Sequence, residues 1–299
     1  ALDPEVEESL ALIANFVERY EEVADDLAVS SPVSARIAAA RDVRERIEEI
    51  RGQAIAKLGE IDLVPLNRRY LSQVDETDRG QNLLDGVEVA GRDNPARYPG
   101  QALGVFQEVE EELPDLLDDI QGFISDYDGR VEYIDENPAV RSVVADGRNL
   151  LEATEELDGR VATLINEARS NIRLAEELRD DYDRLLAEAE DLIREGRRET
   201  VAQAQDRLEE ATSAAVESLS LAYDSDFEDE VNEAQVAIFN LIRQANREIV
   251  RSEVLESVTQ AAELYDEEEY ARAFDIIADA EELWVTQFPE TELASLVVL

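Results

Sequence analysis

The residues best suited to recognition chemistry lie in one irregular stretch, "GVEVAGRDNPARYPGQ" (residues 86–101). It brings Arg92, Arg97 and Tyr98 within seven residues of one another. Arginine can bind a carboxylate or phosphate through paired hydrogen bonds, and tyrosine adds a ring and a hydroxyl group. Long irregular loops often carry function. These three residues are therefore candidate contacts for a protein partner or a ligand. The alternative is a connector that wraps one end of a helical bundle.

A second basic cluster, "REGRRE", occupies residues 194–199. Arg197 and Arg198 could receive an acidic partner, because guanidinium groups pair well with carboxylates. The alternative is that these arginines pair with acidic residues of a facing helix.

Catalytic and metal-binding patterns fail where they can be checked. "DSDFEDE" at residues 224–230 resembles a calcium loop, but an EF-hand would need glycine and glutamate where Asp229 and Gln235 stand. A helix start capped by aspartate is the better interpretation. The chain contains no cysteine, histidine or methionine, so a Cys/His zinc site, a thiol nucleophile and a Ser-His-Asp triad are excluded within it. Neither GxGxxG nor GxxxxGK[ST] occurs. We expect no catalytic, cofactor-binding or metal-binding residues, no cofactor, and no enzyme activity.

The charge is strongly one-sided. The chain has 73 acidic and 28 basic residues, a formal net charge of -45, and Lys57 is its only lysine. Hydrophobic residues make up 44% of the sequence, so it is not a disordered acidic tail. Such a surface suits multimolar salt, where repulsion between carboxylates is screened. We expect a halophilic, archaeal source and a high-salt environment. The same charge argues against nucleic acid and anionic lipid headgroups as partners.

The acidic stretch "RLAEELRDDYDRLLAEAEDLI" (residues 173–193) belongs to a long heptad pattern. Apolar residues step by three and four, and the acids mostly fall between them, on the solvated side of a helix. At Gly196 the pattern shifts phase, which indicates either a local bend or the end of one helix and the start of another. The predicted seam consists of Leu157, Val161, Leu164, Ala168, Asn171, Ala175, Leu178, Tyr182, Leu185, Ala189 and Leu192.

Helical periodicity covers most of the chain, and glycine and proline concentrate between Val64 and Pro138. Neighbouring long helices joined by short turns must lie antiparallel. The predicted fold is all-α, an elongated antiparallel helical bundle or coiled coil. We divide it into an N-terminal helical hairpin (1–63), an irregular Gly/Pro-rich helical connector (64–138), and long coiled-coil helices ending in a hairpin (139–299). Helices are expected over 4–29, 32–61, 66–84, 101–127 with a bend at Pro114, 139–223 unless broken at Gly196, and 228–265.

The second of these helices, over 32–61, is expected to bury a single stripe. Its members are Ile37, Val43, Ile47, Ile50, Ile55 and Leu58.

The chain contains no run of about 18 apolar residues that would cross a membrane. It starts at Ala1 without a methionine and stops on "SLVVL". We expect a truncated or processed piece whose membrane tether lies outside these residues, the alternative being that the apolar C-terminus packs in the core.

The closing segment, "AAELYDEEEYARAFDIIADAEELW" (residues 261–284), resembles two families. Tyr265, Tyr270, Ala273 and Ala280 fall where a tetratricopeptide repeat has comparable residues, although only one such unit is visible. The segment is also similar to the end of the bacterial septation-ring regulators (EzrA), with their "LF…Y…AL…A" ending. That resemblance implies a spectrin-like arc of antiparallel bundles held to the membrane by one N-terminal helix. It also implies an intracellular scaffold that binds the tubulin-like division protein, but it carries over no partner-binding residue.

The sequence therefore favours a non-catalytic, membrane-anchored scaffold on the cytoplasmic side, which presents helical surfaces to protein partners in cell division. Its expected partners are proteins, among them a tubulin-like filament, and self-association is allowed for. One alternative is an extracellular cell-surface stalk. Another is a ligand-sensing helical domain that uses the loop near Arg92 to Tyr98.

Overall fold

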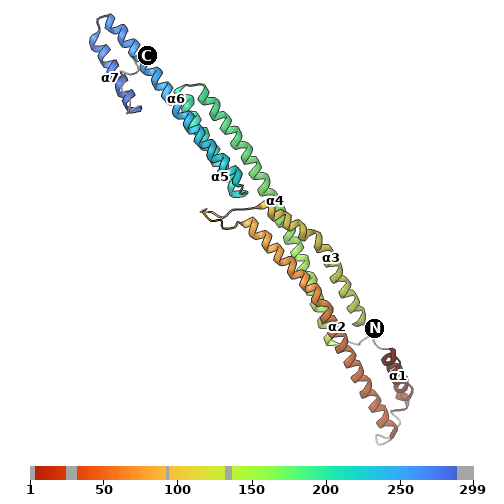
Figure 1. The fold of residues 1–299 in the computed structure, drawn as a ribbon. Coiled ribbons are helices and arrows are strands. Elements are labelled where there is room, and N and C mark those ends of the chain that lie inside the picture. The colour runs from red at the N-terminus through yellow and green to blue at the C-terminus, as the bar shows by residue number, and fades with distance from the viewer. Residues whose placement is uncertain (1–3, 25–31, 92–93, 132–136, 288–299) are drawn as a thin grey trace. The chain divides into compact units, whose positions relative to one another are not determined.

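The computed structural model describes residues 4–24, 32–91, 94–131 and 137–287. Within these ranges the chain forms helices and no strand, which confirms the predicted all-α class (Figure 1). The helices are α1 (Pro4–Ala24), α2 (Pro32–Asp85), α3 (Pro99–Val131), α4 (Pro138–Arg194), α5 (Arg198–Leu221), α6 (Ser225–Asp266) and α7 (Tyr270–Gln287). The predicted end of the first helix, at Val29, lies outside the described residues.

The chain divides into two compact units. Unit 1 contains Ala1–Gln81 and Leu103–Asn166, and unit 2 contains Asn82–Ala102 and Glu167–Leu299. Each unit is built around antiparallel helices with its own buried core, as expected for long helices joined by short connections.

In unit 1, helices α2 and α3 run antiparallel and are joined by hydrogen bonds between side chains. The Tyr127 hydroxyl donates to Asp62 Oδ2 at 2.6 Å, and Gln73 Nε2 donates to Glu112 Oε2 at 2.6 Å. Burial, together with the neighbouring Asp62 carboxylate, raises the pKa of Tyr127 to about 12. The hydroxyl therefore stays protonated and remains a donor across the physiological range.

Helix α4 runs in the same direction as α2 and completes the three-helix bundle of unit 1. Where Arg160 of α4 meets α2, its Nη2 atom lies 2.7 Å from Asp78 Oδ1. The apolar core gathers side chains from all three helices, so no pair of helices could bury it alone. One cluster of this core consists of Ile55, Ala56, Phe123, Tyr127, Val140, Val143 and Val144.

The predicted break after Ile61 is wrong, because α2 continues through Pro65 to Asp85. A proline inside a helix removes one backbone hydrogen bond and crowds the preceding turn. Here Leu63 and Leu66, on either side of the proline, pack against core residues of α3 and α4. Tertiary packing thus outweighs the local cost, and α3 likewise continues through Pro114.

In unit 2, the C-terminal part of α4 packs against α5 and α6. Ser218 Oγ of α5 donates to the Ala175 carbonyl oxygen of α4 at 2.9 Å, and Gln235 Nε2 of α6 donates to Thr212 Oγ1 of α5 at 3.0 Å. The helix does end at the phase shift: α4 stops at Arg194, and Gly196 has a φ of 66°. Glycine adopts this left-handed conformation without the steric cost that other residues meet. The core consists of Tyr182, Leu185, Ala189, Ile193, Val201, Ala204, Leu208, Ala211, Ala214, Ala215, Leu219, Phe227, Val231, Ile238, Ile242 and Ile249.

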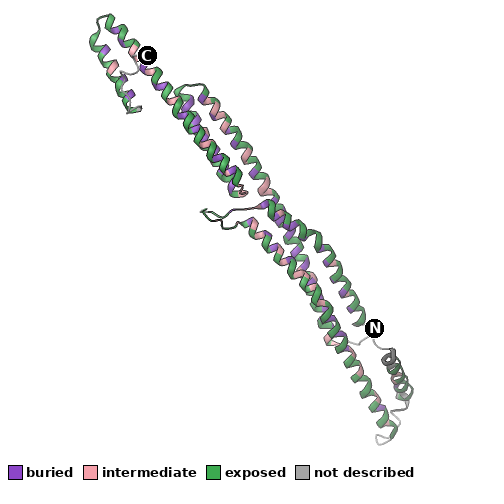
Figure 2. Ribbon diagram, in the orientation of Figure 1, coloured by how far each residue is buried: buried purple, intermediate pink, exposed green. Residues whose placement is uncertain are grey.

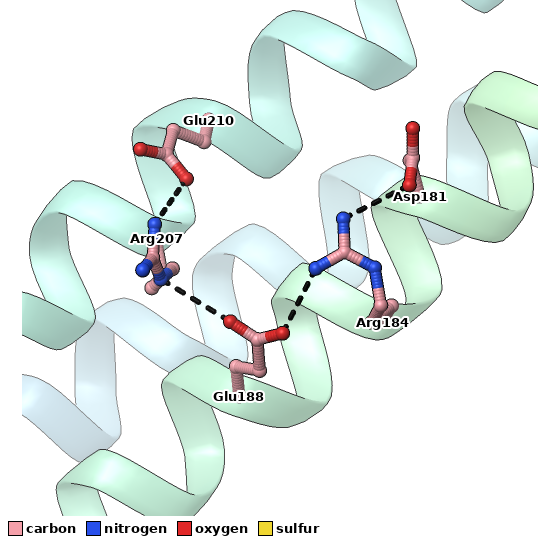
Figure 3. Close-up of polar contacts among 5 residues, drawn as sticks. All are labelled: Asp181, Arg184, Glu188, Arg207 and Glu210. Atoms are coloured by element: carbon pink, nitrogen blue, oxygen red, sulfur yellow. Dashed lines mark hydrogen bonds and ion pairs between the residues drawn. The ribbon is translucent and has the colours of Figure 1, made fainter.

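The acids of residues 173–193 form part of a network of surface ion pairs, as the heptad pattern predicts. Arg184 binds Asp181 and Glu188 on its own helix at 2.9 and 2.8 Å (Figure 3). Glu188 also accepts Arg207 Nε of α5 at 3.2 Å, and Arg207 pairs with Glu210. Hydrogen bonds first from Asp181 and then from Glu188 raise the pKa of Arg184. These exposed carboxylates therefore link neighbouring helices at the solvent surface.

The C-terminal hairpin of α6 and α7 packs through small residues and not through its tyrosines. Ala273 and Ala280 are buried between the two helices, the latter with Trp284. Tyr265 and Tyr270 lie exposed at the turn, with their ring centroids 5.1 Å apart. The expectation that a tyrosine packs these helices together is therefore wrong, although the small residues do pack there.

We expect Gly59→Ala to destabilise unit 1, although alanine normally favours a helix over glycine by about 1 kcal/mol. A Cβ at position 59 would lie 2.5 Å from Val143 Cγ1 and 3.0 Å from the Tyr127 ring. Relieving this overlap should cost about 1–3 kcal/mol. Gly122→Ala on α3 is the matched control, because a Cβ there meets nothing within 4 Å. Chemical denaturation should show lower stability for the first variant and slightly higher stability for the second. Equal gains in both would contradict close packing at Gly59.

Candidate partner-binding surfaces

The loop between α2 and α3 is a short closed hairpin, held at its base. Val87 and Ala96 exchange two backbone hydrogen bonds of 2.8 Å, and Ala96 is fully buried. Gly86 and Gly91 have positive φ angles of 117° and 92°, which only glycine adopts readily. Arg92 lies outside the described residues. The predicted loop therefore exists, and its described part is anchored to the fold.

Arg97 and Tyr98 tie this loop to the α5–α6 turn. The Arg97 carbonyl oxygen accepts the Tyr223 N–H at 2.8 Å, and Arg97 Nε donates to the Asp85 carbonyl at 3.3 Å. The rings of Tyr98 and Tyr223 meet edge to face with centroids 5.9 Å apart. The structure thus places these two candidate residues in contacts that close the end of the unit 2 bundle, which supports the connector alternative.

Beside this contact lies an open cleft of about 500 Å³ within unit 2. Its walls come from the start of α3, from α4 and from the α5–α6 turn, and they include Tyr98, Glu176, Arg179, Tyr223 and Asp224. Arg179 Nη1 pairs with Asp224 Oδ2 at 3.0 Å, and the guanidinium lies 4.5 Å from the centroid of the Phe227 ring. The arginine of this cleft is therefore already balanced by a carboxylate, and an anionic ligand would have to compete with Asp224.

Asp224 has a second role as the N-cap of α6. Its Oδ1 atom accepts the backbone N–H groups of Asp226 and Phe227 at 3.1 and 3.3 Å. Burial opposes its ionisation, but these hydrogen bonds and the Arg179 guanidinium outweigh burial and hold the pKa of Asp224 below its ordinary 3.8. This confirms that "DSDFEDE" begins a capped helix.

Replacing Asp224 should therefore separate capping from charge. Asp224→Ala removes the cap and should lower the free energy of unfolding by about 1 kcal/mol, whereas Asp224→Asn keeps a capping oxygen and should lose less. Because the folded-state pKa is lowered, the contribution of the charge is present above pH 4 and disappears as the pH falls through the folded-state value.

Thermal unfolding in constant salt between pH 6 and pH 3 would test this. The wild type should lose more stability on acidification than Asp224→Asn does. Parallel curves for the two proteins would rule out the charge contribution.

Arg197 and Arg198 flank the turn between α4 and α5, and both pair with acids. Arg197 pairs with Glu195, whose hydrogen bond is the main reason that the pKa of Arg197 is raised. Arg198 pairs with Glu253 of the facing helix α6. The intramolecular alternative accounts for both contacts, so this cluster is not a cationic patch awaiting a partner.

Sequence reasoning missed a surface on α2. The predicted single stripe splits in two: Ile37 and Ile55 are buried, whereas Val43, Ile50 and Leu58 are exposed. The exposed residues lie on the side of α2 opposite its core-facing residues, and they are 45% to 65% exposed (Figure 2). We call this set the α2 outer stripe: Val43, Ile50, Leu58, Ile61, Val64 and Leu71.

A signal for this stripe is present in the sequence. A helix with one buried face places its apolar residues at intervals of three and four that follow one side. The apolar positions of α2 cannot all be assigned to one side, because Ile55 and Leu58 lie on different sides from Ile50 and Ile61 when followed at 3.6 residues per turn. A second apolar face was therefore detectable before the structure.

Two searches of the described residues concern other kinds of site. Across the ranges that the structure covers, no group of three or more His, Cys, Asp or Glu side chains is arranged to hold a metal ion. None of the described helices is both long and apolar enough to cross a membrane. Comparisons with protein-family models, with curated proteins and with solved structures found no match to this chain.

Proposed function

We propose that the chain is a non-catalytic helical scaffold of a halophile, which presents helical surfaces to protein partners. The observation that carries this proposal is the α2 outer stripe, six apolar residues exposed on one side of a helix whose opposite side already fills the core. Exposed apolar surface of this kind is typical of protein–protein contact. Here it occurs in a chain whose net charge of -45 keeps most other surface in water.

The rest of the proposal extends the resemblance to the septation-ring regulators. We place the chain in a membrane-anchored protein, tethered through a segment outside these residues, on the cytoplasmic side. In this role it would contact a tubulin-like division filament. Support comes from the antiparallel bundles of each unit, the arrangement that the resemblance implies. The alternative is an extracellular surface stalk, which the same helices would serve equally well.

The full-length gene, tagged with a fluorescent protein and imaged in dividing cells of its own host at native salt, distinguishes these roles. The division scaffold should give a band at midcell that disappears when the tubulin-like filament is depleted. An even outline around the cell that external protease removes would instead identify a surface stalk. Uniform fluorescence throughout the cell would contradict both.

A high-salt environment makes a separate prediction about stability. Repulsion among 73 acidic residues opposes the compact state in dilute buffer, and salt screens it. The melting temperature should therefore rise by about 10 °C or more between 0.1 M and multimolar KCl, as screening shortens the Debye length from about 10 Å to about 3 Å or less. Differential scanning calorimetry across a KCl series measures this. A melting temperature independent of salt would contradict the halophilic origin.

Ligand sensing is the second candidate function, and the cleft of about 500 Å³ beside Arg179 is the observation that favours it. A ligand that binds only the folded state must stabilise that state. A compound that raises the melting temperature of the wild type but not of Arg179→Ala would therefore support this function over a purely structural one.

A further inference from the structure

The α2 outer stripe has the spacing of a coiled-coil seam. Positions seven residues apart lie on one side of a helix, and a second set four residues later completes the pattern. The two sets are Val43, Ile50, Lys57, Val64 and Leu71, then Ile47, Ala54 and Ile61. All of them belong to unit 1, and Lys57 is the one charged member. This side of α2 therefore matches a partner helix that packs along it, more than a small ligand.

The local charge limits which partner can approach. Residues 43–71 contain six basic and five acidic residues, a net charge of +1. The remainder of the chain contains 22 basic and 68 acidic residues, a net charge of -46. A second copy of the chain meets strong repulsion over surfaces of that composition, but almost none along this stripe. Electrostatics thus permits self-association here while opposing it on the acidic surface.

We propose that the occupant of the α2 outer stripe is the α2 outer stripe of a second copy, packed antiparallel about a two-fold axis near Lys57. The spacing is symmetric about Lys57, so that Val43 faces Leu71 and Ile50 faces Val64 of the other copy. A two-fold contact uses the same patch on both subunits, and antiparallel helices place opposite ends of their dipoles together.

The size of the contact sets its strength. The stripe spans 28 helical steps, about 42 Å, and a helix is about 10 Å wide, so each copy would bury roughly 400 Å². The total of about 800 Å² falls below the range of stable complexes and within that of transient ones. We therefore expect a Kd on the order of 10–100 μM. The inference rests on the proposed scaffold function, because a tethered scaffold raises its local concentration and needs only weak lateral contacts.

Lys57 would set the affinity of the pair. Its amine lies 2.5 Å from Glu60 Oε2 on the same helix, and its side chain is largely exposed. In the antiparallel pair the two copies of Lys57 meet at the centre, where a charged seam residue fixes register and costs stability. Replacing it with leucine should therefore tighten the association.

Sedimentation equilibrium of the 299-residue chain in multimolar KCl, over a concentration series that spans the expected Kd, tests the pairing. The wild type should show a reversible monomer–dimer equilibrium. Ile61→Asp should weaken it at least tenfold, and Lys57→Leu should tighten it at least tenfold. Val236→Asp on α6 is the matched control, because Val236 is 63% exposed and Ile61 is 64% exposed. It should leave the equilibrium unchanged, and circular dichroism should show unchanged helicity in all the variants.

Two outcomes would overturn the proposal. In the first, both the wild type and Lys57→Leu remain monomers throughout the series. In the second, a dimer is unaffected by Ile61→Asp or is disrupted by Val236→Asp, which would place the contact elsewhere. Neither outcome depends on where the protein lies in the cell, so a monomer would leave the scaffold function standing. Conversely, uniform fluorescence in cells alongside an intact dimer would remove the scaffold function and keep the pairing.

The absence of cysteine from the chain permits a clean test of orientation. Under mild oxidation Lys57→Cys should form a cross-linked dimer, whereas Ile50→Cys alone should not exceed the background set by Val236→Cys. The double variant Ile50→Cys/Val64→Cys should cross-link, because those positions face each other in the antiparallel pair. Efficient cross-linking of Ile50→Cys alone would show parallel helices and overturn the proposed arrangement.

Discussion

The balance between a thin apolar core and a surface crowded with carboxylates is the constraint on which the rest of this structure depends. Many core positions of unit 2 are alanines, among them Ala189, Ala204, Ala211 and Ala215. Each removes little apolar surface from water compared with leucine or isoleucine, at about 25 cal/mol per Å². The helices must therefore pack closely and over long distances to offset the repulsion of a net charge of -45.

Local features of the bundles follow from this need for close packing. Gly59 allows α4 to approach α2 more closely than any side chain would permit, and Ser218 hydrogen-bonds directly to a backbone carbonyl of the neighbouring helix. The exceptions are also informative. Tyr182 is buried in the unit 2 core, and its hydroxyl has no hydrogen-bond partner among the described residues. Burial, with the carboxylates of Glu230 and Asp183, raises its pKa to about 12. An unpaired buried hydroxyl has a cost of its own, which the edge-to-face contact with Phe227 partly offsets.

How far the sequence predicted the structure depends on which physical effect decided each feature. The heptad seam from Leu157 to Ala189, the helix break at Gly196 and the cap at Asp224 follow from local periodicity and backbone chemistry, and all three are present. The break after Ile61 was wrong, because the packing of Leu63 and Leu66 against other helices overrides the effect of Pro65. No local rule contains that information.

The candidate contacts divide in the same way. The basic residues attracted attention by their type, but Arg97 and Arg198 form contacts within the chain. The surface with unsatisfied chemistry is instead apolar, and it was hidden because α2 carries two apolar sides. A periodicity argument that assumes one buried face per helix assigns Val43 and Ile50 to the core and so cannot see an exposed stripe.

The single lysine gives the α2 outer stripe a chemical identity of its own. Within these 299 residues, Lys57 carries the one side-chain amine, and it is exposed near the middle of that stripe. Any reaction that acylates lysine side chains can therefore modify this chain at one position only. Acetylation would remove a positive charge from the one nearly neutral stretch and add apolar surface to it. A composition that replaces lysine with arginine almost everywhere thus concentrates amine chemistry on a single helix face.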